Sequence, residues 1–171
     1  MKQSHVYHIP PLKIEPILEI HEIGSGWVFA SLHGSWGDRS IDMSNVACEC
    51  PVKGLIRVAT AVRQQRSPVD ICFHQEPHCD WLTMHHLSAD SWEVELGESN
   101  SLKWSREASR VRLVATDVWS GYIFWMSVIH AFAPYCQGAQ RETFVKCLGE
   151  FPDREFRSLL AAKAHEESLR G

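Results

Sequence analysis

Alternation of apolar and polar residues predicts strands in the first part of the chain. Over residues 13–22, apolar side chains alternate with charged ones, as on a strand with one buried face. The turn-forming triplet Gly24-Ser25-Gly26 follows, and the apolar run at 27–32 predicts a second strand. A short third strand is expected at 40–43.

The clearest pattern is a group of three short strands that follow one another along the chain. They are expected at residues 69–75, 80–87 and 91–97, and the links between them are only a few residues long. Links this short join antiparallel neighbours, so the pattern predicts a β-meander.

Period-two geometry divides the meander into an apolar face and a polar face. If Gln75 pairs with Asp80, Phe73 lies opposite Leu82 on the apolar face. The other face then carries mostly polar side chains: Asp70, Cys72, His74, Thr83, His85, Glu93 and Glu95. One side of this sheet is therefore expected to pack on the core, and the other to face solvent.

Helical spacing of apolar residues occurs once before the meander and repeatedly after it. The first amphipathic helix is expected at 52–66. After a final strand at 111–114, helices are expected at 119–133, 142–148 and 152–170.

The order of these elements predicts a single α+β domain of 171 residues, with a mainly antiparallel sheet, a β-meander and helices packed on one face. Residues 1–11 contain two prolines and little periodicity, and are expected to form a loose N-terminal arm. The composition, 44% hydrophobic and 22% charged, is that of an ordinary globular protein.

Neither export nor membrane insertion is indicated. The N-terminus lacks the apolar run of about 7–15 residues that a secretory signal needs. The apolar stretch at 118–135 is interrupted by polar residues and is shorter than the ~20 residues of a spanning helix. A cytoplasmic location is expected, where the six cysteines stay reduced as free thiols.

A group of metal-ligating residue types lies around the link between the first two strands of the meander, at His74, His78, Cys79 and His85. Imidazole and thiolate are the ligands that zinc prefers. Their spacing fits neither C-x-x-C nor H-E-x-x-H, and ten histidines in 171 residues make some neighbours expected by chance. Ordinary histidines are therefore favoured, no cofactor is predicted, and a zinc enzyme or metal-binding module is the alternative.

No catalytic residue is predicted. Asp70, His85 and Glu93 would form a polar row across the meander, but alternating carboxylates on an exposed strand are typical of a solvated face. Cys79 and His78 are adjacent in a turn, where neighbouring side chains rarely point at each other.

Charge and aromatic residues favour a protein-binding surface instead. The formal net charge of −4 argues against direct binding of nucleic acid, whose phosphates need clustered Lys and Arg. Carboxylates on the meander, including Asp90 and Glu98, would form an acidic zone that attracts a basic partner, and tryptophans in a glycine turn and a polar loop would anchor it. The candidate partner-binding residues are Trp36, Asp70, His85, Asp90, Glu93, Glu95, Glu98 and Trp104.

The predicted helix at 52–66 is followed by a strand that ends in Glu76-Pro77 and by a strand that carries Trp81 at its start. A later aromatic-proline pair, Phe151-Pro152, precedes the last helix. This arrangement resembles small cytoplasmic bacterial immunity proteins of polymorphic toxin systems. The resemblance implies a non-catalytic protein that neutralises a cognate toxin by direct binding, in contact-dependent or type VI competition. Electrostatic attraction would speed the association of such an acidic inhibitor with a basic nuclease.

Overall fold

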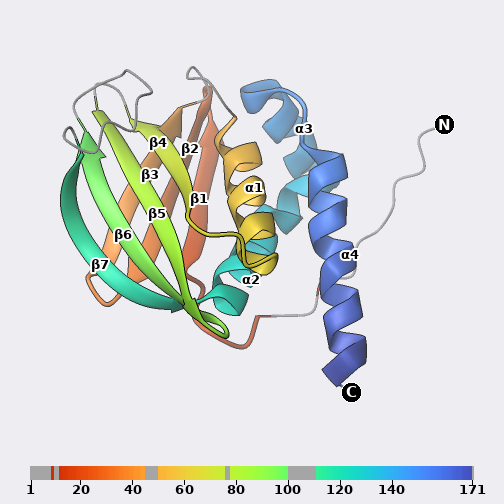
Figure 1. Ribbon diagram of the computed structural model, residues 1–171. Coiled ribbons are helices and arrows are strands. Elements are labelled where there is room, and N and C mark those ends of the chain that lie inside the picture. Colours follow the sequence, from red (N-terminus) through yellow and green to blue (C-terminus); the bar gives the residue numbers. More distant parts are fainter. Residues whose placement is uncertain (1–8, 10–11, 45–49, 76–77, 100–110, 171) are drawn as a thin grey trace.

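The computed structural model describes residue 9 and residues 12–44, 50–75, 78–99 and 111–170, with backbone alone for 162–170. Within these residues the chain forms two antiparallel sheets and a group of helices, which confirms the predicted α+β class. The two sheets lie one behind the other, and the helices gather along one side of them (Figure 1).

The first sheet has three strands in chain order: β1 (Leu18–Gly24), β2 (Trp27–Gly34) and β3 (Gly37–Ser44). Ser25 and Gly26 link β1 to β2 with φ of 51° and 83°. Positive φ at both central residues is what a two-residue type I′ hairpin requires. The strand predicted at 13–22 begins only at Leu18, consistent with Pro16 having no N–H to donate to a ladder.

The second sheet is the predicted meander. Its order is β4 (Val69–Gln75), β5 (His78–Ser88), β6 (Ser91–Ser99) and β7 (Arg112–Ser120). The predicted register is wrong by two residues, because β5 begins earlier than expected: Gln75 pairs with His78, and Phe73 with Asp80. A shift of two residues leaves every side chain on its predicted face.

The last strand is longer than predicted. The sequence indicates a strand at 111–114 and a helix from Trp119, but β7 continues to Ser120 and Trp119 pairs with Trp92. The helix begins after Ser120, whose Oγ accepts a hydrogen bond from Ile123 N at 3.1 Å. A serine in this position caps the free N–H groups of the first helical turn.

The helices are α1 (Pro51–Arg63), α2 (Gly121–Phe132), a 3₁₀ helix (Ala133–Cys136), α3 (Gly138–Leu148) and α4 (Asp153–Arg170). They agree with the predicted helices to within a few residues at most ends. Among the described residues, no helix is long and apolar enough to cross a membrane.

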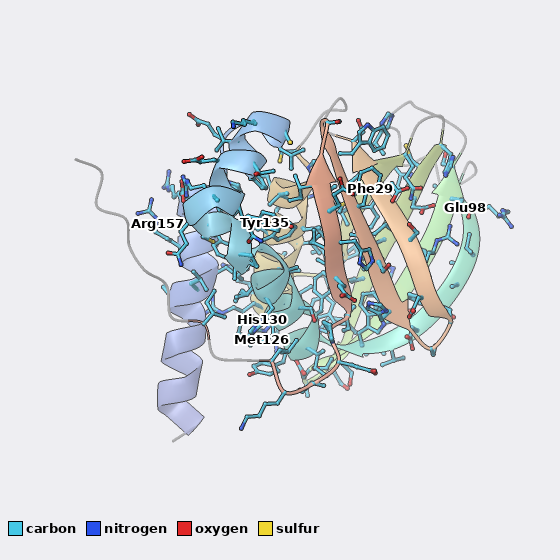
Figure 2. The ribbon with its side chains drawn as sticks, turned by 180° about the vertical axis from the view of Figure 1, so that it is seen from behind. Phe29, Glu98, Met126, His130, Tyr135 and Arg157 are labelled. Carbon is cyan, nitrogen blue, oxygen red and sulfur yellow. The ribbon has the colours of Figure 1, made fainter. Side chains whose placement is uncertain are left out.

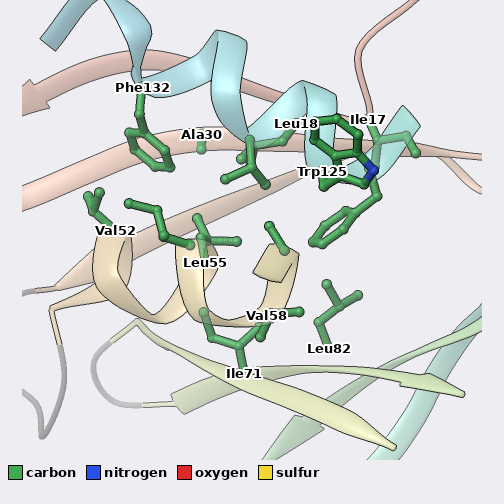
Figure 3. Packing of buried hydrophobic residues seen from close by; sticks show 14 of the residues in the cluster. Ile17, Leu18, Ala30, Val52, Leu55, Val58, Ile71, Leu82, Trp125 and Phe132 are labelled. Atoms are coloured by element: carbon green, nitrogen blue, oxygen red, sulfur yellow. The ribbon is translucent and has the colours of Figure 1, made fainter. Parts of the chain in front are cut away.

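Helix α1 packs between α2 and strand β4 of the meander. Leu55 and Val58 of α1 lie between Trp125 of α2 on one side and Ile71 and Leu82 of the meander on the other (Figure 3). Each of these side chains is buried, and full burial of such a side chain contributes roughly 1.5–3 kcal/mol. The core thus holds both sheets rigidly and leaves one face of each sheet directed outward.

Candidate functional site

The outward face of the meander brings together four of the predicted partner-binding residues. The register places Asp70 opposite Thr83, and Thr83 opposite Glu95. His85 lies opposite Glu93 in the neighbouring row. Because directly paired residues point to the same side of a sheet, these side chains share one face, which we call the acidic sheet face.

The carboxylates of the acidic sheet face are only partly compensated. His85 Nε2 lies 3.7 Å from Glu95 Oε2, which is too long for a hydrogen bond. Among the described residues, the exposed carboxylate of Glu93 has no cationic partner, and neither has that of Asp70. The backbone carbonyl of Asp70, by contrast, accepts a hydrogen bond from Arg57 of α1.

Two apolar side chains lie on the edge strand beside these carboxylates. Val118 pairs with Glu93 and is 60% exposed, and Leu113 pairs with Gly97 and is 57% exposed. The acidic sheet face therefore combines negative charge with exposed apolar area on a strand that ends the sheet, a composition suited to a protein partner.

Asp90 does not belong to the acidic sheet face. It lies in the turn between β5 and β6, and its Oδ1 accepts a hydrogen bond from Tyr122 N at 2.8 Å. Its Oδ2 accepts one from the hydroxyl of Ser120. Asp90 thus holds the start of α2 beside a cleft of about 430 Å³ whose lining includes Trp92 and Trp125. Asp90 was predicted to belong to an acidic zone, but its carboxylate instead anchors the start of α2.

Glu98 lies on the inner face of the meander, contrary to its predicted place in the acidic zone. Its carboxylate is paired with Arg39 of β3 and with Arg112 of β7. The same Arg39 lies 3.2 Å from Asp80, which is buried on β5. Hydrogen bonds from Arg39 first, and from Arg112 second, hold the pKa of Glu98 below its ordinary value. This network joins the two sheets.

Of the two predicted aromatic anchors, Trp36 is half-buried. Trp36 packs against Trp119 with ring centroids 5.6 Å apart, and its indole Nε1 is buried without a hydrogen-bond partner among the described residues. Trp36 therefore closes the gap between the β2–β3 turn and β7. Trp104 lies outside the described residues.

The alternative metal ligands do not converge on one point. His74 pairs with Cys79 on β5, and His78 pairs with Gln75. His85 is six residues further along β5 than Cys79, which corresponds to roughly 20 Å of extended strand. Within the described part of the chain, no group of three or more His, Cys, Asp or Glu side chains is arranged to hold a metal ion.

Some residues that organise these surfaces escaped sequence reasoning. Arg39 precedes Ile41 and Met43 at period two, and Asp80 precedes Leu82 and Met84 in the same way. That parity places both charges on buried faces, and a buried charge is expected to be paired. The alternation therefore indicated that each charge needs a partner, although it did not identify that partner.

Comparison with known proteins identifies no relative of this chain. No family model matches it, and neither a curated protein nor a solved structure does. The resemblance to immunity proteins stays a prediction.

Proposed function

We propose that the chain is a non-catalytic binding protein that uses the acidic sheet face to bind a basic protein partner. The most specific form of this proposal, which draws on the resemblance of the Glu76-Pro77 region, is an immunity protein that neutralises a cognate bacterial toxin. Such a protein has to present a complementary surface of about 800 Å² on a rigid body, and it requires no chemistry of its own.

The uncompensated carboxylate of Glu93 is the observation that carries the proposal. Three carboxylates elsewhere in the chain are engaged: Glu98 by two arginines, Asp90 by the start of α2, and Asp153 by Arg141. Glu93 instead points outward from a four-stranded sheet, beside Glu95 and the exposed Val118. Negative charge that is held on a rigid face without an internal partner is free to pair with a cation from outside.

The chemistry of this face defines the partner. A surface of carboxylates steers a positively charged protein during encounter and raises its association rate. The apolar area of Val118 and Leu113 supplies contact that a purely electrostatic encounter lacks. A basic toxin, for example a nuclease with a cationic substrate cleft, has the matching charge.

A pull-down from lysate of the native organism tests the proposal with paired charge-reversal variants. The wild-type chain is expected to retain a basic protein, and Glu93→Lys/Glu95→Lys is expected to lose it. The matched control is Glu142→Lys/Glu150→Lys, because both glutamates are exposed on the helical side, away from the sheet. If the control loses the protein as well, or if the sheet variant keeps it, the acidic sheet face is not the binding surface.

A further inference from the structure

The outward face of the other sheet, formed by β1, β2 and β3, carries an aromatic pair, of which Trp27 is half-buried and Phe29 is exposed. Trp27 and Phe29 of β2 are stacked, with ring centroids 6.5 Å apart and an interplanar angle of 22°. Phe29 is 36% exposed and lies on the near side of this sheet in Figure 2. The meander lies behind it in that view, so this face and the acidic sheet face are on opposite sides of the molecule.

A carboxylate stands on each side of Phe29. The register pairs Phe29 with Glu22 of β1 and with Asp42 of β3, so all three side chains form one row across the sheet. Neighbouring strands lie about 4.8 Å apart, which places the two acidic positions within side-chain reach of any group above the ring. We call Glu22, Trp27, Phe29 and Asp42 the aromatic–acidic patch.

Neither carboxylate of the patch is neutralised within the described residues. Asp42 Oδ1 accepts one long hydrogen bond, from Ser40 Oγ at 3.3 Å. Glu22 is exposed, and its Oε1 leans toward Gly24, 3.3 Å from where a Cβ of that residue would stand. Gly24 is the pairing partner of Trp27, so the carboxylate of Glu22 is turned toward the part of the patch that holds the indole.

This combination selects a particular cation. The faces of Trp and Phe attract a positive charge, and the attraction strengthens when water is displaced. Carboxylates on both sides accept hydrogen bonds from the edges of a group that lies flat on the rings. A guanidinium meets both conditions, because it is planar, stacks on aromatic faces and donates from its edges, whereas an ammonium is a compact and strongly hydrated point charge.

We propose that the aromatic–acidic patch is a docking site for an arginine side chain of a partner protein. The guanidinium stacks on Phe29 and Trp27 and pairs with Glu22 and Asp42. This site does not depend on the proposed immunity function, since it lies on the other sheet and requires only an arginine-bearing segment.

An NMR titration of the full chain, labelled with ¹⁵N, tests the proposal with short synthetic peptides. The probe is acetyl-Gly-Arg-Gly-Arg-Gly-amide, and the comparison peptides replace both arginines by lysine or by citrulline, which keeps the shape but removes the charge. The arginine peptide is expected to shift the amide signals of Glu22, Phe29 and Asp42. The lysine peptide is expected to bind several-fold more weakly, and the citrulline peptide to produce no saturable shift.

Two sets of variants distinguish binding at the aromatic–acidic patch from general attraction to a negatively charged protein. Glu22→Gln/Asp42→Asn is isosteric, at one exposed and one half-buried position, and is expected to weaken binding of the arginine peptide by roughly tenfold or more. Phe29→Ala is expected to weaken it several-fold. The control Glu93→Gln/Glu95→Gln removes equal charge from the opposite face and is expected to leave the dissociation constant unchanged.

Four outcomes would overturn the proposal. They are the absence of any saturable shift with the arginine peptide, equal binding of the lysine peptide, equal loss of binding in the control variant, and self-association. The last would be seen as a concentration-dependent dimer in sedimentation that Phe29→Ala abolishes, and it would assign the patch to a second copy of the chain.

Discussion

The backbone N–H of Ser35 donates a hydrogen bond to Asp117 Oδ2 at 2.7 Å, although the two residues are 82 positions apart in the chain. The bond fixes the β2–β3 turn of one sheet against β7 of the other. Asp117 also accepts hydrogen bonds from Val118 N and from Trp119 Nε1, at 2.8 Å and 2.9 Å. A single carboxylate therefore positions the turn, the edge strand and the indole on which Trp36 packs.

Asp117→Asn is expected to lower the free energy of unfolding by about 1–3 kcal/mol, because an amide nitrogen replaces one acceptor and leaves donors unsatisfied. Urea unfolding followed by tryptophan fluorescence measures the change. Glu142→Gln, at an exposed position on α3, is the control and should change stability by less than about 0.5 kcal/mol. Equal stability of Asp117→Asn and wild type would show that the turn is held by packing alone.

The arginines that share Glu98 are expected to contribute very differently. Arg39→Leu leaves Asp80, whose side chain is 2% exposed, with the Gln75 amide as its side-chain hydrogen-bond donor, and should cost about 3 kcal/mol. Arg112 is 75% exposed, so Arg112→Leu should cost less than about 1 kcal/mol. The same urea titrations compare the two variants. Similar losses of unfolding free energy would show that the burial of Asp80 does not make Arg39 the more important arginine.

Stability should fall at acidic pH because Glu98 and Asp117 become protonated. Hydrogen bonds from Arg39 and Arg112 lower the pKa of Glu98. Burial by itself raises the pKa of Asp117, but the bonds from Ser35, Val118 and Trp119 outweigh it and leave that pKa lowered. A carboxylate whose pKa is lowered in the folded state contributes fully to stability above its ordinary pKa, which is 4.5 for Glu98 and 3.8 for Asp117. That contribution is lost as the pH falls through the pKa of the folded state.

Urea midpoints measured between about pH 6 and pH 3 should therefore be nearly constant down to about pH 4.5 and then decline. Glu98→Gln/Asp117→Asn should be less stable at neutral pH and should show a shallower decline. A double variant whose acid slope equals that of wild type would assign the pH dependence to other groups.

Cys136 is expected to be chemically inert in the folded protein. Burial first, and the negative charge of Asp153 second, raise the pKa of its thiol to about 12, with Arg141 acting in the opposite direction. Because the thiolate is the reactive form, iodoacetamide at pH 8 should leave Cys136 unmodified while the half-buried Cys147 reacts faster. Peptide mass spectrometry reads out both sites, and early labelling of Cys136 would show that the helical layer opens readily.

Alternation predicted the faces of the meander correctly, because side-chain direction depends only on parity along a strand. Parity also places Arg39 and Asp80 on buried faces, but their pairing depends on how two separate sheets meet, and local pattern does not encode that. The predicted acidic zone lost two residues for different reasons. The turn carboxylate of Asp90 became a helix cap, and Glu98, which lies beyond the predicted strand end but shares the parity of Leu96, faces inward and became an ion-pair partner.

The row of Glu22, Phe29 and Asp42 shows a similar limit. Each residue lies on a strand that the pattern at least partly predicts, yet their alignment requires the register of two hairpins. That register follows from the two-residue turns after Gly24 and Gly34. Only the folded sheet brings the two carboxylates to either side of one ring.

The most direct test of the binding function is a protection assay in cells that express, one at a time, the toxins encoded by the native strain and its neighbours. Co-expression of the wild-type chain should restore growth against one basic toxin, Glu142→Lys/Glu150→Lys should restore it equally, and Glu93→Lys/Glu95→Lys should not. Failure of the wild-type chain to protect against any of these toxins, or full protection by the sheet variant, would contradict the account.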